Sequence, residues 1–158
     1  MASFIRKSWC IVLISLISTR LAAQPTNPAA AQHWVDSVFK TLSKKEKIAQ
    51  LMVVRVSSIG PNRTITFYEK EVEEAIRTYN IGGICLFQGG PVKQALLVNH
   101  FQQIAKTPIM VTIDAENGVG MRMDSVMGLP RQMMMGAVQD PSLIYEYGRV
   151  VGEQCKRI

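Results

Sequence analysis

The chain has 158 residues, of which 47% are hydrophobic and 19% are charged, and its formal net charge is +6. This length allows one domain with a sizeable core. The basic residues are mixed with acidic ones, as at residues 44–47, and form no basic stripe interleaved with aromatic residues. We therefore expect no binding of nucleic acid.

The first 23 residues follow the three-part pattern of a secretory signal peptide. Arg6 and Lys7 precede a mostly apolar stretch at residues 9–17, and small residues end at Ala23. The stretch is shorter than the roughly 20 residues that span a bilayer. We therefore expect cleavage after Ala23, export to the periplasm or beyond the cell, and no stable membrane span afterwards. An uncleaved membrane anchor is the alternative.

A short linker and the start of a folded domain come next. Residues 24–32 contain two prolines and three successive alanines, which indicates a linker, and the folded domain is expected over residues 33–158. Ser43 and Glu46 have the spacing of a capping box, which opens a helix. Residues 52–56 then predict the first strand.

Helices and strands alternate through the rest of the chain. An amphipathic helix is expected over residues 67–79 and a short apolar strand over residues 84–87. Pro91 suits the first turn of the next helix, and a third strand follows at residues 109–113. A last helix is expected over residues 141–157. This alternation implies a parallel sheet with right-handed crossovers. Three such units begin either a doubly wound sheet or a (β/α)₈ barrel, and the pattern alone does not choose between them.

The last helical pattern runs to the end of the sequence without a glycine cap, a proline stop or a polar tail. We therefore interpret the chain as the front part of a larger protein.

Two cysteines remain after the expected cleavage. Cys85 lies in an apolar strand and Cys155 on a helix, which favours two buried free thiols, although an oxidising compartment keeps a disulfide possible. Neither cysteine has the CxxC or histidine spacing of a metal site, and three successive methionines at residues 133–135 are interpreted as packing residues.

The most informative segment is residues 112–124, where acidic residues, glycines and an arginine follow the third strand. Asp114 is expected at the carboxyl end of a buried parallel strand, which is where α/β proteins build their sites. A carboxylate accepts from two neighbouring hydroxyls, and the guanidinium of Arg122 offers a planar fork of donors. The simpler alternatives are a loop aspartate and a solvated arginine. Glu116 is either half of an acid/base pair or a support for the loop.

Several motifs in fixed order, at residues 46–51, 79–87, 108–122 and 140–149, resemble the N-terminal domain of family 3 glycoside hydrolases. The closest likeness is to the β-N-acetylhexosaminidase branch, and it covers residues 42–158. The resemblance implies a (β/α)₈ TIM barrel of which this chain supplies about the first three βα units. It also implies retaining hydrolysis of terminal β-linked N-acetylhexosamine, from oligosaccharides or peptidoglycan fragments, with no metal or organic cofactor.

The resemblance assigns roles to some residues and none to others. Asp114 and Arg122 would bind the non-reducing sugar, and Glu116 would support the loop. The family's aspartate nucleophile and the histidine of its Lys-His-Phe-Pro-Gly-His-Gly loop match nothing in this sequence, since His33 and His100 have no such surroundings. No catalytic residue is therefore assigned here, and the chain alone is expected to be inactive.

Two other classes of protein are alternatives to this interpretation. One is a small exported α/β module that binds a sugar or another polar ligand without catalysis. The other is a nucleotide-binding domain, which is disfavoured because the glycine pairs at residues 82–83 and 89–90 lack both the GxGxxG and the GKS/T spacing.

Overall fold

The computed structural model describes residues 27–158, so the predicted signal peptide lies outside the described residues. The chain divides into two compact units, residues 1–40 and 41–158. The described part of the first unit is almost entirely helix α2 (Pro28–Thr41), whose last residue already belongs to the second unit. This helix begins inside the range predicted as a linker, because Pro28 suits a first helical turn and the alanines after it favour helix. None of the described helices is long and apolar enough to cross a membrane.

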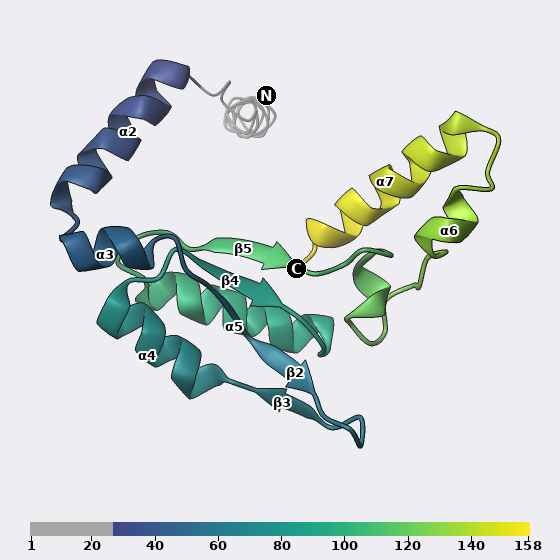
Figure 1. Cartoon of the computed structure of the whole chain (residues 1–158), viewed down its shortest axis with the longest axis horizontal. Coiled ribbons are helices and arrows are strands. Elements are labelled where there is room, and N and C mark those ends of the chain that lie inside the picture. The colour runs from purple at the N-terminus through teal and green to yellow at the C-terminus, as the bar shows by residue number, and fades with distance from the viewer. Residues whose placement is uncertain (1–26) are drawn as a thin grey trace, which may run out of the picture. The chain divides into compact units, whose positions relative to one another are not determined.

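The second unit is built on a three-stranded parallel sheet. Its strands are β1 (Val53–Arg55), β4 (Gly83–Leu86) and β5 (Met110–Ile113), in the order β1-β4-β5. Helices α4 (Glu69–Tyr79) and α5 (Pro91–Ile104) connect successive strands (Figure 1). The mixed α/β class and the parallel sheet are confirmed, and each strand lies within one residue of its predicted position.

A hairpin that the sequence analysis missed lies between β1 and α4. Strands β2 (Ser57–Ile59) and β3 (Ile65–Phe67) pair antiparallel, with Ser57 opposite Phe67. The hairpin's turn includes Arg63 in the left-handed region, at a φ of 59°. The expected helix over residues 67–79 therefore begins later, at Glu69, because residue 67 still belongs to a strand.

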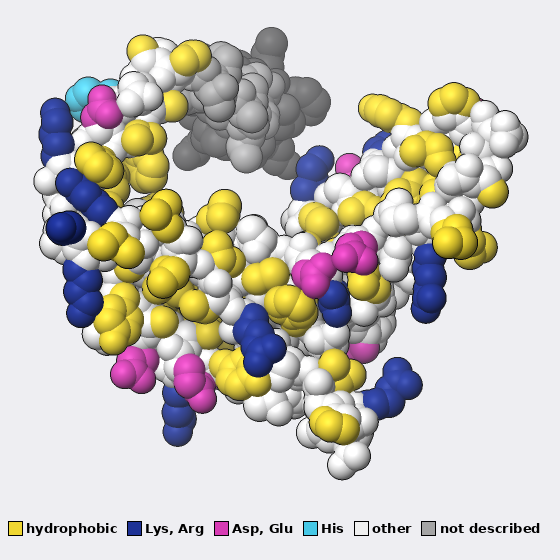
Figure 2. Space-filling view, in the orientation of Figure 1, with side chains coloured by type: hydrophobic (Ala, Val, Ile, Leu, Met, Phe, Trp, Pro, Cys, Tyr) yellow, Lys and Arg dark blue, Asp and Glu magenta, His cyan; other side chains and the backbone are white. Residues whose placement is uncertain are grey.

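The core lies between one face of the parallel sheet and the two helices. Ile84 and Leu86 point to this face, where they join the buried cluster that includes Val72, Ile76, Leu97 and Phe101. The opposite face leaves apolar side chains accessible: Val53 is 46% exposed and Met110 is 56% exposed. Hydrophobic side chains lie over the region of the strands in Figure 2.

Three short or peripheral helices follow β5: η1 (Val119–Met121), α6 (Gln132–Met135) and α7 (Pro141–Cys155). Helix α7 begins as expected, with the Asp140 carboxylate accepting a hydrogen bond of 2.9 Å from the backbone N–H of Ser142.

The methionine run was predicted to pack at the base of the loop, and for Met133 and Met134 this prediction is wrong. Met133 is 91% exposed and Met134 is 63% exposed. Successive residues on a helix point about 100° apart, so three consecutive side chains cannot all face a core. Both described cysteines are free thiols, but Cys155 is exposed and Cys85 is only half-buried, so their predicted burial is also wrong.

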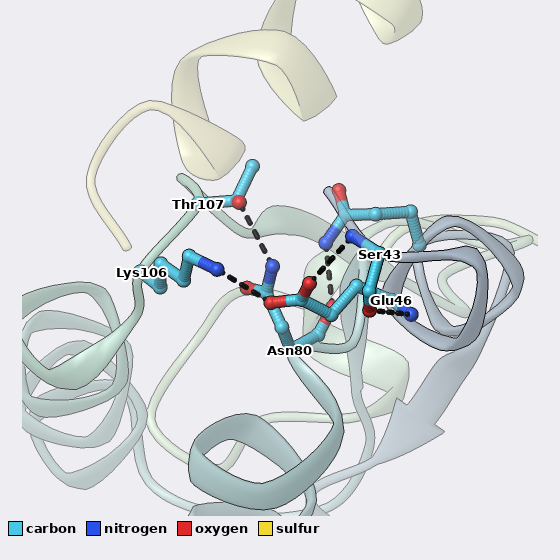
Figure 3. Close-up of polar contacts among 6 residues, drawn as sticks. Ser43, Glu46, Asn80, Lys106 and Thr107 are labelled. Carbon is cyan, nitrogen blue, oxygen red and sulfur yellow. Dashed lines mark hydrogen bonds and ion pairs between the residues drawn. The ribbon is translucent and has the colours of Figure 1, made fainter. Parts of the chain in front are cut away.

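At the amino end of the sheet, polar side chains tie α3 (Lys44–Ala49) to the chain before β4 and β5 (Figure 3). The predicted capping box is confirmed: the Ser43 hydroxyl accepts from the Glu46 N–H at 3.2 Å, and the Glu46 carboxylate accepts from the Ser43 N–H at 2.8 Å. The other oxygen of Glu46 lies 2.6 Å from Lys106 Nζ.

The same end of the sheet holds a buried amide. Asn80 ends α4 in the left-handed region, at a φ of 57°, and its Nδ2 donates to the Thr107 hydroxyl at 3.1 Å. Gln50 Nε2 donates to the backbone oxygen of Asn80 at 2.6 Å. The chain segments that enter β4 and β5 are therefore fixed by side chains from neighbouring elements.

Candidate functional site

Asp114 directly follows β5 at the carboxyl end of the parallel sheet. Its backbone N–H donates to Leu86 O at 3.4 Å, which continues the pairing with β4 for one more residue. Side chains alternate along a strand, so Asp114 is placed on the same side as Thr112, the side turned away from α4 and α5. Its side chain is 38% exposed and therefore accessible to a ligand.

Arg122 returns to Asp114 from eight residues further along the chain. Its Nη2 lies 2.5 Å from Asp114 Oδ2, and its Nε donates to the backbone oxygen of Asp114, also at 2.5 Å. Only 18% of the Arg122 side chain is exposed. One planar guanidinium thus holds both the side chain and the backbone of Asp114, so the two residues predicted from the sequence form one unit.

An aromatic ring packs against the same guanidinium. The centre of the Phe87 ring lies 5.0 Å from Arg122 Cζ, within the range of a cation–π contact. Phe87 follows β4 directly, at the same edge of the sheet as Asp114. The sequence analysis did not select it, although an aromatic residue directly after a buried strand was the available signal.

The backbone around Arg122 is pinned to the loop after β4. Gly89 N–H donates to Arg122 O at 3.2 Å, and Asp124 N–H donates to Gly89 O at 3.1 Å. The chain reaches this position through the 3₁₀ turn η1, which Gly118 enters at a φ of 82°. A Cβ on Gly120 would lie 2.5 Å from Met127 O, so this turn needs a glycine there.

Glu116 takes part in the loop through its backbone. Its carbonyl oxygen accepts a hydrogen bond from Gln132 Nε2, which links the loop to α6. Its exposed side chain lines a cavity of about 620 Å³ together with Asn117 and Arg131. This contact is made by the backbone, so the role of the Glu116 carboxylate stays a prediction.

Neither histidine has a contact with Asp114 or Arg122 among the hydrogen bonds of the described residues. His33 is exposed on α2, and His100 on α5 lies 3.3 Å from Glu73 Oε2, also in an exposed position. Within residues 27–158, no group of three or more His, Cys, Asp or Glu residues is arranged to hold a metal ion.

The arrangement suits recognition of a polar ligand rich in hydroxyl groups. A carboxylate has about four lone-pair sites, so Asp114 keeps accepting capacity after its contact with Arg122. Hydrogen bonds to an ionised acceptor are roughly twice as strong as neutral ones, and Arg122 fixes the direction of that acceptor.

Comparison with known proteins gives the family. A search of curated proteins found no match to this chain. The family model described as "Glycosyl hydrolase family 3 N terminal domain" matches residues 43–158, which is most of the chain. The parallel sheet with its connecting helices is consistent with part of the TIM barrel of that domain. The chain therefore belongs to glycosyl hydrolase family 3, and residues 43–158 match the N-terminal domain of that family.

Proposed function

We propose that this domain belongs to a retaining glycoside hydrolase that removes terminal β-linked N-acetylhexosamine from oligosaccharides or peptidoglycan fragments. Membership of glycosyl hydrolase family 3 supports the hydrolase class and a carbohydrate substrate. The finer substrate rests on the motif resemblance to the β-N-acetylhexosaminidase branch. Export of the protein is part of the same proposal and rests on the signal-peptide pattern of the first 23 residues.

One observation carries the proposal: Asp114 and Arg122 meet at the carboxyl end of β5, 2.5 Å apart, with the carboxylate still accessible. This is the end of the strands where TIM barrels bind their substrates. In our proposal the Asp114 carboxylate accepts from hydroxyls of the non-reducing sugar, and the Arg122 guanidinium contacts the same sugar and keeps the carboxylate in place.

We further propose that additional βα units complete the barrel and supply the nucleophile and the acid/base. The open edges of β1 and β5 support this, since a closed barrel pairs its last strand with its first. The exposed apolar side chains Val53 and Met110 support it too, because the inner face of a barrel is normally filled by side chains from all strands. The chain expressed alone is then expected to show no glycosidase activity.

The decisive experiment is Asp114→Asn in a protein that contains the completed barrel, assayed with an aryl N-acetyl-β-glucosaminide. Loss of one preorganised charged acceptor should cost on the order of 2 to 4 kcal/mol in the transition state, so kcat/KM should fall by about 30- to 1000-fold. The fold should persist, since the carboxylate is partly exposed. Asp124→Asn is the matched control, because that carboxylate lies in the same loop and contacts Ser125.

Unchanged kcat/KM in Asp114→Asn would show that Asp114 is an ordinary loop residue and does not bind the sugar. The same assay distinguishes the alternative of an exported binding module. Such a module would bind N-acetylglucosamine through Asp114 but release no aryl group, even with the complete protein.

A further inference from the structure

A buried amide lies beneath the candidate site and is not used by the proposed function. Gln94 on α5 has no exposed surface, and its Nε2 lies 3.3 Å from Phe87 O and 3.2 Å from Gln88 O. One side-chain donor group therefore holds two consecutive backbone oxygens directly after β4. We infer that Gln94 is a positioning residue that fixes the loop after β4 and, through it, Arg122 and Asp114.

The oxygen of the Gln94 amide indicates that this residue acts through its N–H groups. Among residues 27–158, Gln94 Oε1 finds no hydrogen-bond partner although it is buried. An unsatisfied buried acceptor is destabilising, so an apolar side chain would fill this place in the core at lower cost. The amide is useful at this position because its N–H groups satisfy the two carbonyls.

Ser57 on β2 contacts the same loop. Its hydroxyl, in a residue with no exposed surface, donates to Gln88 O at 2.6 Å. The carbonyl of Gln88 thus receives donors from two elements, α5 and β2. This pair of donors fixes the peptide plane between Gln88 and Gly89.

Two routes lead from this loop to the candidate site. The first is the backbone: Gly89 exchanges hydrogen bonds with Arg122 O and Asp124 N at 3.2 and 3.1 Å. The second is the Phe87 ring, which packs 5.0 Å from the Arg122 guanidinium. Gln94 binds the carbonyl oxygen of Phe87, which starts the second route, and that of Gln88, which directly precedes Gly89 in the first. Both routes end on Arg122.

The space around Gly89 shows how closely these parts fit. A Cβ at this position would lie 2.9 Å from Gln94 Nε2 and 2.8 Å from Phe67 Cζ. The loop therefore rests directly against the amide, and displacement of the amide must be transmitted to Gly89. Since Gly89 is hydrogen-bonded to the segment that carries Arg122, the displacement reaches the guanidinium.

The test is hydrogen/deuterium exchange on the full chain, followed by mass spectrometry of peptides containing Gly89 and Asp124. Gln94→Met keeps the volume and removes the donor. It should speed exchange of these two amides by about tenfold, the equivalent of one lost hydrogen bond. A residue that only filled the core would instead change exchange evenly across α5 and the sheet. Ser57→Ala is the milder variant, and it should speed exchange in the same peptides. It replaces Gln94→Met in the test if that variant fails to fold.

The matched control is Gln102→Met on the same helix. Gln102 also clasps a backbone, donating to Ile109 O at 2.7 Å and accepting from Ile109 N at 3.0 Å, but it does so before β5, at the other end of the sheet. Its loss should speed exchange at Ile109 and leave Asp124 unchanged. Unchanged exchange at Gly89 and Asp124 in both Gln94→Met and Ser57→Ala would overturn the inference.

A second measurement links the inference to chemistry, and this part rests on the proposed function. In the aryl N-acetyl-β-glucosaminide assay of a protein that contains the completed barrel, Gln94→Met should lower kcat/KM by about tenfold, and Gln102→Met should leave it unchanged. If the unmodified protein with the completed barrel shows no turnover, the proposed function fails, but the exchange result still decides whether Gln94 positions Arg122.

Discussion

The two ends of the parallel sheet use polar residues in opposite ways. At the amino end, Glu46 contacts Ser43 and Lys106, and the buried side chain of Asn80 contacts Thr107 (Figure 3). These partners all come from the chain itself. At the carboxyl end, Asp114 is held by Arg122 but remains 38% exposed, with accepting capacity left over.

In our proposal, this difference separates contacts that stabilise the fold from contacts that recognise a ligand. Contacts at the amino end join α3 to the segments that enter β4 and β5, so their loss should be felt as loss of stability. Contacts at the carboxyl end orient the solvent-accessible carboxylate of Asp114, so their loss should lower ligand affinity and turnover. This division of labour is the one that TIM barrels follow in general.

The most damaging change is expected at the amino end, in Gly82→Ala. A Cβ on Gly82 would lie 1.9 Å from Gln50 O and 2.6 Å from Gln50 C, both backbone atoms that cannot rotate away. We expect a loss of about 3 kcal/mol in the free energy of unfolding, measured by urea denaturation followed by circular dichroism. Gly148→Ala is the control, because a Cβ there meets no atom within 4 Å. Equal stability of the two variants would contradict the tight approach at the amino end.

A change at the carboxyl end should separate the two effects. Arg122→Lys keeps the charge but cannot donate from Nε and Nη2 in one plane, so it loses one of its two contacts with Asp114. We expect kcat/KM for the aryl N-acetyl-β-glucosaminide to fall by about tenfold, while the free energy of unfolding changes by about 1 kcal/mol or less. Arg77→Lys, in the exposed pair with Glu73, is the control. If Arg122→Lys lost stability but kept its kcat/KM, the carboxyl end would serve stability rather than recognition.

Much of the fold was accessible from the sequence because its signals are local. Apolar runs marked the three strands of the parallel sheet to within one residue, and the Ser43–Glu46 spacing predicted its capping box. The hairpin of β2 and β3 was missed because its strands are only three residues each and mostly not buried, so they leave no clear apolar run.

The site was accessible only in part. Asp114 and Arg122 were selected because an acid and an arginine follow a buried strand, and the structure brings them together; their role toward a sugar stays a prediction. Phe87 was not selected although it follows a buried strand directly, and Ser57 and Gln94 were not selected because each acts through hydrogen bonds to backbone oxygens of another segment. Gln94 reaches its carbonyl partners six and seven residues back across a turn, and Ser57 lies 31 residues from Gln88. Spacing along a sequence does not reveal such contacts.

The smallest effect is expected from Glu46→Gln, which tests the amino end without a steric clash. The hydrogen bond from Lys106, followed by those from Ser43, lowers the pKa of Glu46 from its ordinary 4.5 to about 2. Because this pKa is lower in the folded than in the unfolded chain, the stabilisation is complete above pH 4.5 and is lost as the pH falls toward 2.

Glu46→Gln should therefore lower the free energy of unfolding modestly at pH 7. Between pH 4.5 and 2, the variant should lose less stability than the unmodified protein does. The effect is modest because the Lys106 side chain is 59% exposed, so water and salt screen the pair. Urea titrations at pH 7, 4 and 2.5 measure it, and Glu74→Gln on the exposed side of α4 gives the generic effect of removing one carboxylate. If Glu46→Gln and Glu74→Gln follow the same pH curve, the contact with Lys106 adds nothing to stability. The amino end of the sheet would then depend on the steric fit at Gly82 and on the buried Asn80 amide rather than on this ion pair.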